Sequence, residues 1–358
     1  MSAPTPWVLH VDLDQFVAAV EVLRHPELAG RPVVVGGRGD PTERGVVSTA
    51  SYEARELGVH SGLPLRVAAR KAPDAVFLPV DGPAYEAVSE EVMTALRGLG
   101  VVVEVLGWDE AFLGAVTDDP EALARWAQET VLAATRLHCS VGIGDTKVRA
   151  KIATGFGKPA GVFRLTAASW FDVMGERPAI ELWGVGTKVS RRLAGLGIRT
   201  VAELAAAPTD ALVAEFGPRM GVWYHELGNG LGPTTVDDRP WVPRGHSRET
   251  TFQQNLTAPA QVRAAVDELA RAVVVDTAED GREVVRVALK VRYAPFETKL
   301  LSRRLPAPSR DAAEVVATAL ALAEGLEDRE VRLLGVRAEM AMPADADPAE
   351  RTPVRGRI

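Results

Sequence analysis

The sequence contains a single cysteine, Cys139, among its 358 residues. One thiol can form neither an intramolecular disulfide nor a multi-cysteine metal site, and such sparse use of cysteine fits a reducing compartment. Apolar residues flank it on both sides within residues 137–143. The thiol is therefore predicted to be buried and structural.

Long apolar runs and an N-terminal signal pattern are also lacking. No stretch approaches the ~20 apolar residues that a membrane-spanning helix requires. The N-terminus shows no basic segment followed by an apolar one, as a secretory signal would. We therefore expect a cytoplasmic protein that contacts no membrane.

Positively charged residues are also fewer than negatively charged ones. The chain carries 41 lysines and arginines against 48 aspartates and glutamates, which gives a net charge of -7. A small DNA-binding domain is usually basic, so the bulk charge argues mildly against a nucleic-acid partner. Acids gathered at a metal site would also lower the total, which makes local charge the better guide.

The amino-acid composition, with 47% hydrophobic and 25% charged residues, is typical of a globular protein. The length predicts two to four domains. Strands and helices alternate up to about residue 170, helices alone are predicted over 180–230, and a proline-containing linker over 235–246. Strands and helices return over 260–341 in a mostly antiparallel arrangement. We predict an α+β multidomain protein with a flexible tail over 343–358.

Three carboxylates stand where strands are predicted to end. Asp12 follows an apolar strand, and Asp109 and Glu110 form the tip of a hairpin between residues 101–106 and 111–116. If these strands are neighbours, the acids repel one another, and divalent cations such as Mg²⁺ relieve that repulsion. Two such ions can activate a hydroxyl nucleophile and stabilise a departing pyrophosphate. The alternative is that the acids are ordinary surface turn residues.

A second group of side chains suits phosphate oxygens. Thr49, Tyr52 and Arg55 are spaced three apart, which would place them on one face of a helix. Their hydroxyls and guanidinium fork match phosphate, and Lys158 adds a point charge on a loop. The alternative for Arg55 is an ion pair with a neighbouring glutamate.

Two further features suit a nucleic-acid backbone. Gly184 and Gly186 open a predicted helix that carries Lys188, and backbone N–H groups at such a turn can contact a phosphate. The alternative is a plain glycine turn. Residues 286–310 hold seven basic residues and one acid, a set that could line one face of a sheet or form an ordinary solvated surface. The basic residues are Arg286, Lys290, Arg292, Lys299, Arg303, Arg304 and Arg310.

Read together, these residues resemble the Y-family DNA polymerases, and most closely their DNA polymerase IV (DinB) type. The similarity runs in family order over nearly the whole chain to about residue 341. The matching stretches are LHVDLDQF (9–16), PELAGRPVVVGG (26–37), STASYEARELGVHSGLPL (48–65), WDEAFL (108–113), SVGIGDTKVRAKIATGFGKPAGV (140–162), LWGVGTKVSRRLAGLGIRTVAEL (182–204), RETTF (248–252) and RLLGVR (332–337).

The resemblance implies a right-hand polymerase with palm, small fingers, a helical thumb and an α+β little-finger domain. The implied boundaries are palm 1–16 and 82–170, fingers 17–81, thumb with helix-hairpin-helix 171–236, linker 237–245, little finger 246–342 and tail 343–358. The implied activity is template-directed DNA synthesis of low fidelity that tolerates damaged templates.

The resemblance also implies roles for individual residues. Asp12, Asp109 and Glu110 match the catalytic acids, which with the Leu13 carbonyl would bind two Mg²⁺ ions, with Mn²⁺ as an alternative. The implied nucleotide contacts are Phe16, Val17, Thr49, Tyr52, Arg55 and Lys158. The implied DNA contacts are Gly184, Gly186, Lys188, Arg248, Arg292, Arg303 and Arg304. The implied partners are primer-template DNA and deoxynucleoside triphosphates, bound by a monomer.

Two departures from the family pattern matter. The family usually has an aromatic residue at position 17, whose ring clashes with a ribose 2′-hydroxyl, whereas this chain has Val17. We therefore expect ribonucleoside triphosphates to be accepted too. The tail lacks the glutamine-plus-aromatic peptide that this family uses to bind the sliding clamp, so clamp dependence is not expected. The alternative functions are a non-catalytic DNA-binding accessory protein of the same fold and another palm-type enzyme such as a nucleotide cyclase.

Overall fold

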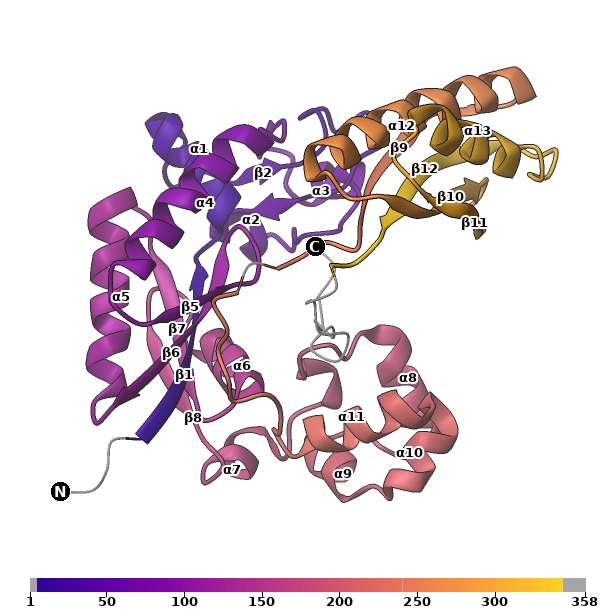
Figure 1. The fold of residues 1–358 in the computed structure, drawn as a ribbon. Helices are drawn as coiled ribbons and strands as arrows, with labels where there is room; N and C mark the ends of the chain where they lie inside the picture. Colours follow the sequence, from indigo (N-terminus) through magenta and orange to yellow (C-terminus); the bar gives the residue numbers. More distant parts are fainter. Residues whose placement is uncertain (1–4, 240, 344–358) are drawn as a thin grey trace. The chain divides into compact units, whose positions relative to one another are not determined.

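The computed structural model describes residues 5–239 and 241–343, which form two compact units (Figure 1). The first unit comprises residues 5–40 and 46–239, and the second comprises residues 41–45 and 241–343. Each unit has its own hydrophobic core. The multidomain α+β architecture predicted from the sequence is confirmed.

A five-stranded sheet in the order β5-β6-β1-β7-β8 forms the centre of the first unit. β1 lies in the middle and pairs antiparallel with both β6 and β7. The predicted hairpin is confirmed, with Val105 opposite Ala111. The edge strand β8, which pairs parallel to β7, was not predicted. The bounds are β1 Thr5–Leu13, β5 Val102–Val105, β6 Glu110–Thr117, β7 Cys139–Gly144 and β8 Val162–Leu165.

Alternation along β1 divides its side chains between two environments. Leu9, Val11 and Leu13 face a core shared with helices α4 (Gly82–Arg97) and α5 (Pro120–Thr135). The intervening residues, from Val8 to Asp12, face the opposite side, where helix α6 packs. α6 spans Lys147–Gly157 and is capped by the Thr146 hydroxyl, which accepts from the Arg149 N–H at 3.2 Å. Polar residues of β1 therefore gather beneath α6.

A second, three-stranded sheet in the order β3-β2-β4 lies in the same unit. Its strand β3 is short and comprises only Thr49–Ala50. Ser51 then caps helix α2 (Tyr52–Glu56), its hydroxyl accepting from Ala54 N–H at 3.3 Å. Thr49 therefore lies on a strand, and its predicted place on a helix face with Tyr52 and Arg55 is wrong. The other bounds are α1 Phe16–Arg24, η1 Pro26–Leu28, β2 Val33–Val35, α3 Leu65–Lys71 and β4 Val76–Leu78.

Residues 166–228 contain helices and no strand, as predicted for residues 180–230, and they pack around the buried Trp170. The chain that follows folds back onto the five-stranded sheet. Val236 packs against Val8 and Phe112, and the Asp237 N–H donates to Glu104 at 2.8 Å. The first part of the predicted linker is therefore anchored. The bounds are α7 Trp170–Met174, η2 Ala179–Glu181, α8 Thr187–Gly195, α9 Val201–Ala206, α10 Thr209–Phe216 and α11 Pro218–Gly228.

The second unit is an antiparallel sheet in the order β11-β10-β12-β9, with both of its helices packed on one face. Its first strand, β9, was not predicted, because most of its residues are exposed and it has no buried apolar stripe. Of the predicted flexible tail, residues 344–358 lie outside the described residues. The bounds are β9 Gly245–Leu256, α12 Pro259–Asp280, β10 Val284–Tyr293, β11 Thr298–Ser309, α13 Ala312–Ala323 and β12 Val331–Met340.

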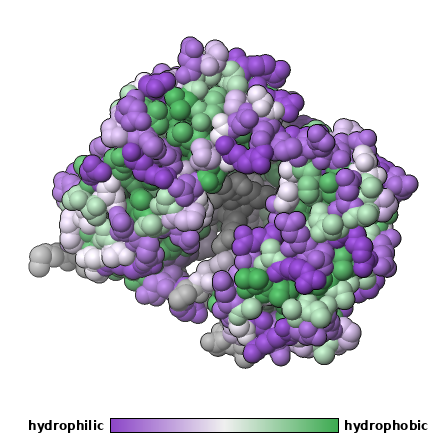
Figure 2. Space-filling view, turned by 90° about the horizontal axis from the view of Figure 1, so that it is seen from above, coloured by the Kyte–Doolittle hydropathy of each residue, from purple (hydrophilic) through white to green (hydrophobic). Residues whose placement is uncertain are grey.

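Among the described residues, none of the helices combines the length and apolar character needed to span a bilayer. On the face shown in Figure 2, hydrophilic residues are interspersed with small apolar patches. Cys139 is buried as predicted, and burial raises the pKa of its thiol to about 12.

The contact between α6 and the sheet depends on glycine. A Cβ atom on Gly142 of β7 would lie 2.0 Å from the Ala150 carbonyl oxygen and 2.3 Å from the Thr154 nitrogen. Both are helix backbone atoms, so no side-chain rotation could relieve the clash.

We expect Gly142→Ala to lower the free energy of unfolding by about 2 kcal/mol or more, because α6 must move away from β7. Gly155→Ala is the matched control, since Gly155 lies within α6 and a Cβ there meets nothing within 4 Å. That variant should be neutral or slightly stabilising. Urea denaturation measures both, and a Gly142→Ala protein as stable as wild type would contradict the close packing.

Candidate active site

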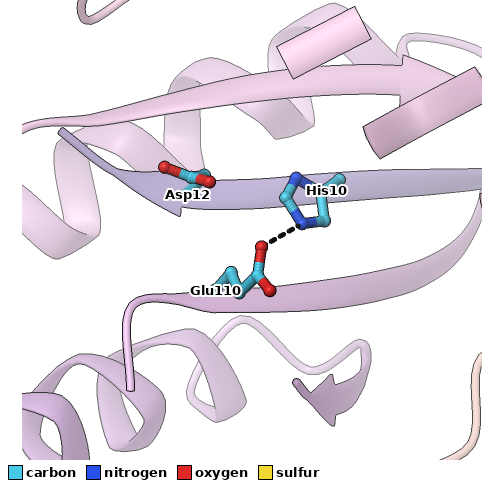
Figure 3. A group of neighbouring side chains, drawn as sticks. All are labelled: His10, Asp12 and Glu110. Atoms are coloured by element: carbon cyan, nitrogen blue, oxygen red, sulfur yellow. Dashed lines mark hydrogen bonds and ion pairs between the residues drawn. The ribbon is translucent and has the colours of Figure 1, made fainter. Parts of the chain in front are cut away.

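The pairing of β1 with β6 places two acids from distant parts of the chain side by side. Asp12 lies directly opposite Glu110 in the strand register, and the Leu13 N–H donates to the Asp109 carbonyl at 2.8 Å. Together with His10, the two acids offer ligand atoms that all lie within 4.8 Å of one another. In Figure 3 the His10 ring and the Glu110 carboxylate face each other across the two strands, with Asp12 beside them on the strand of His10.

Asp109 stands next to this group without joining it. Its side chain is partly buried at the hairpin tip, one residue before β6 begins. Burial, together with the negative charges of Asp12 and Glu110, raises the pKa of Asp109 to about 6 despite the opposing charge of Lys158. The three predicted acids therefore lie close enough for their charges to affect one another. Asp12 and Glu110 are the two that stand directly opposite each other.

His10 is a member of the group that sequence reasoning missed. Its ring is 1% exposed, with Nδ1 2.8 Å from the Thr154 hydroxyl and Nε2 3.2 Å from a Glu110 carboxylate oxygen. Burial lowers the pKa of this imidazole, although the hydrogen bond to Glu110 opposes the shift. A polar residue two positions before Asp12 in an otherwise apolar strand shares its face, and that spacing could have identified it.

Two lysines of α6 and the loop after it contact the acids. Lys151 forms an ion pair and hydrogen bond with Glu110, and Lys158 does the same with Asp12. Burial alone would raise the pKa of Glu110, but the hydrogen bond from His10 and the charge of Lys151 outweigh it and lower that pKa to about 2.

Lys151 was not predicted as a site residue. Its spacing in the sequence carried a signal, because positions 147, 151 and 158 recur on one face of a helical repeat. The sequence did not reveal that this face covers the polar side of β1.

The chemistry of this arrangement suits divalent cations. Carboxylate oxygens from Asp12 and Glu110, with Asp109 adjacent, are the hard ligands that Mg²⁺ and Mn²⁺ accept. The acids already attract positive charge, since each member of the facing pair binds a lysine ammonium group. Cations therefore fit the site on charge and on donor type.

Asp14 connects the elements that carry the predicted phosphate ligands. Its carboxylate is 5% exposed and accepts from the Tyr52 hydroxyl at 2.9 Å and from the Ala160 N–H at 2.7 Å. Burial and the charge of Asp14 raise the pKa of Tyr52, so its hydroxyl stays protonated and can donate. Tyr52 and the loop bearing Lys158 are thus held beside Asp12.

The remaining predicted nucleotide contacts lie near these residues with differing exposure. The Arg55 Nε donates to the Ala50 carbonyl at 2.9 Å, and its guanidinium lies 5.3 Å from the Tyr52 ring centroid. Within the part of the chain that the structure describes, Arg55 forms these contacts in place of the ion pair with a neighbouring glutamate. Phe16 is 3% exposed and belongs to the core, so a nucleotide could meet only its backbone, whereas Val17 in the same turn is partly exposed.

The predicted helix-hairpin-helix turn has the expected local form. Gly184 adopts a φ of +90°, and Gly186 precedes α8 without a side-chain cap. The first N–H groups of α8 are therefore open to an anion, and Lys188 beside them is exposed.

The basic residues of the second unit do not share one face, contrary to the sequence-based expectation. Arg304 lies opposite Arg286 on the helix-free face, which Arg292 shares. Arg303 lies opposite the fully buried Val287, so it projects toward the helix-covered side.

Arg248 is also on the helix-covered side, where it forms a bidentate ion pair with Asp276 of α12 at 2.6 and 2.7 Å. The predicted DNA contacts of the second unit are therefore divided between the two faces of its sheet.

Family models match most of the chain. The impB/mucB/samB family matches residues 11–155, its C-terminal domain matches residues 243–350, and the thumb domain of DNA polymerase-iota matches residues 180–231.

Relatives and solved structures agree with these matches. "DNA polymerase IV 2" of Mycobacterium tuberculosis is 51% identical over 95% of this chain and 99% of the relative. "DNA polymerase IV" of Methanoculleus marisnigri is 39% identical over 93% and 94%. A Y-family DNA polymerase chimera superposes with a TM-score of 0.80 at 26% identity, and DinB from Sulfolobus solfataricus with 0.62 at 26%; each match covers 93% of this chain and 98% of the other.

In metal-free protein we expect Asp109→Asn to raise the free energy of unfolding by about 1–2 kcal/mol at pH 8. The folded-state pKa of about 6 lies above the ordinary value of 3.8, so the unfolded chain loses this proton first as the pH rises. The destabilisation of the wild-type fold by the Asp109 charge therefore grows between about pH 4 and pH 6 and is constant at higher pH.

Urea titrations in EDTA at pH 4 and pH 8 measure this difference, which should be small at pH 4. Asp118→Asn is the control, because Asp118 is an exposed acid just beyond the far end of β6 and should change stability at neither pH. Equal stability of Asp109→Asn and wild type at pH 8 would show that the acids do not repel one another.

Proposed function

The chain belongs to the Y-family of DNA polymerases, of the DNA polymerase IV type, and we propose that it transfers nucleotides with two divalent metal ions held by Asp12, Asp109 and Glu110. The enzyme is a DNA-directed DNA polymerase of the translesion class. The register pair of Asp12 with Glu110, next to Asp109, is the observation that carries the proposal. The Leu13 carbonyl would add a backbone ligand at the end of the same strand.

The metal ions, when bound, would activate the primer 3′-hydroxyl and stabilise the departing pyrophosphate. Mg²⁺ is the proposed ion, with Mn²⁺ as an alternative, because the acids offer hard oxygen ligands. Lys158, Tyr52 and Arg55 would bind the triphosphate, and Thr49 lies on the short strand just before them. Lys158 and Tyr52 each hold an aspartate in the ligand-free protein, so both must exchange that partner for phosphate.

For DNA, we propose contacts that do not depend on base sequence. The uncapped start of α8, with Gly184, Gly186 and Lys188, suits a backbone phosphate. In the second unit, Arg292 and Arg304 on the helix-free sheet face suit the same role. The proposed partners are primer-template DNA and nucleoside triphosphates, and the proposed domain boundaries are those implied by the family resemblance.

Ribonucleotide use is a finer proposal that rests on Val17. Gln15 precedes α1, and its side-chain oxygen accepts from the Tyr52 N–H at 2.5 Å, which holds the first turn of α1 beside α2. Val17 in that turn is a short aliphatic residue that is partly exposed, and we propose that it meets the sugar of the bound nucleotide. Apolar contact alone rejects an added hydroxyl by only ~10²-fold.

The alternative is a non-catalytic DNA-binding protein of the same fold. Such a protein would have no use for three clustered acids, which cost stability when no cation is bound. The presence of all three favours catalysis.

We expect Asp109→Ala to lower primer extension by ~10³-fold or more, at least as much as the loss of one transition-state hydrogen-bond donor costs other enzymes. A gel assay with primer-template DNA, the four deoxynucleotides and Mg²⁺ measures it. Asp118→Ala, which removes an exposed acid at the other end of β6, should extend primers normally. Normal extension by Asp109→Ala would rule out the metal proposal.

We expect the wild-type enzyme to prefer deoxynucleotides over ribonucleotides by ~10²-fold or less, and Val17→Phe to increase that preference by at least about tenfold. The reason is that a phenyl ring fills the space a 2′-hydroxyl would enter. Single-nucleotide kcat/KM values for both sugars measure the ratio, and Val17→Leu should be intermediate. A wild-type preference above about a thousandfold would defeat the proposal.

A further inference from the structure

Lys151 has three neighbours that define an unusual position. Its side chain is 17% exposed and its ammonium group forms an ion pair with Glu110. The same nitrogen lies 3.2 Å from His10 Nε2 and 5.4 Å from the centroid of the Trp183 ring. It therefore contacts two of the three residues, His10 and Glu110, whose ligand atoms form the group with Asp12.

We propose that Lys151 is a built-in counter-ion of Glu110, which must leave this carboxylate when a divalent ion binds, so that Lys151 lowers the affinity of the site for free metal. The inference rests on the metal-dependent function proposed above. It assigns to Lys151 a role distinct from the triphosphate ligands.

Displacement follows from geometry and charge. Lys151 binds the Glu110 oxygen that also faces His10, so the ammonium group and a metal ion would compete for one ligand atom. Two cations on one oxygen repel each other strongly in a partly buried site. The face of the Trp183 ring offers the ammonium group a nearby alternative, because aromatic faces attract cations.

The two lysines at the site differ in what would release them. Lys158 is a proposed triphosphate ligand, so an incoming nucleotide would draw it away from Asp12. Lys151 has no such assignment, and only competition at Glu110 would move it. We infer that Lys151 keeps the site weakly loaded with metal until a nucleotide brings its own charge and cation.

Direct measurement of Mn²⁺ binding without nucleotide or DNA tests the inference. Titration of the full chain, followed by the electron paramagnetic resonance signal of free Mn²⁺, should show Lys151→Met binding on the order of tenfold more tightly than wild type. The physical reason is the loss of the competing positive charge.

Lys147→Met is the matched control. Lys147 lies one helical turn earlier on α6, is similarly buried with a 12% exposed side chain, and pairs with Glu104 instead. This variant makes the same change in net charge and should bind Mn²⁺ within about twofold of wild type, because its partner is not a proposed ligand.

Thermal unfolding supplies a second readout. In EDTA, Lys151→Met should melt below wild type, because Glu110 loses its cation, and added Mn²⁺ should raise its melting temperature more than that of wild type. If Lys151→Met does not fold without metal, Lys151→Gln takes its place, since it keeps a hydrogen-bond donor and removes the charge.

Mn²⁺ affinity in Lys151→Met equal to or weaker than in Lys147→Met would overturn the inference. The double variant Asp12→Asn, Glu110→Gln separates this failure from a failure of the proposed function. If that variant loses Mn²⁺ binding while Lys151→Met has the same Mn²⁺ affinity as wild type, only the proposed role of Lys151 is refuted. If it binds Mn²⁺ as well as wild type, the metal proposal falls, and the inference with it.

Discussion

The pairing of β1 with β6 is the constraint on which the site depends. It sets Asp12 opposite Glu110 although nearly a hundred residues separate them in the chain. Such a pairing concentrates negative charge that the fold must offset, and it does so with ammonium groups from α6 and the loop that follows. The stability of the ligand-free protein and the chemistry of the site are therefore two consequences of one strand register.

Three internal pairs connect the residues of the site. Lys158 binds Asp12, the Tyr52 hydroxyl binds Asp14, and Lys151 binds Glu110. In each of these three pairs a carboxylate is bound to a donor of opposite character, whereas Asp109 lies beside the pairs and is destabilised by burial and by its negative neighbours. If the proposed roles hold, nucleotide and metal ions together would satisfy both halves of these pairs, whereas either one alone would leave some groups unmatched. This complementarity favours joint over separate binding.

Elements that depend on local sequence pattern were predicted, whereas features that depend on contacts between distant segments of the chain were missed. The hairpin carrying Asp109 and Glu110 and the amphipathic helices followed from periodicity and turn residues. The strands β4 and β8 were missed because they are short and gain their order from neighbours. His10 could have been identified from its place two residues before Asp12 on the same strand face, whereas Lys151 could be recognised only from the packing of α6 over the polar side of β1. Arg303 and Arg304 point to opposite faces because neighbouring side chains alternate along a strand, and only the pairing with β10 shows that Arg303 is the one on the helix-covered side.

The close approach of α6 to β7 has a consequence for how the site can respond. Backbone atoms of the helix rest almost directly on Gly142, which leaves the helix no freedom to slide or tilt. Any rearrangement at the acids must then come from the long, flexible side chains of α6 while the helix backbone stays in place. Rotamer changes are fast and cost little compared with moving a packed helix, so the rearrangement of charge proposed for this site would leave the core of the protein in place.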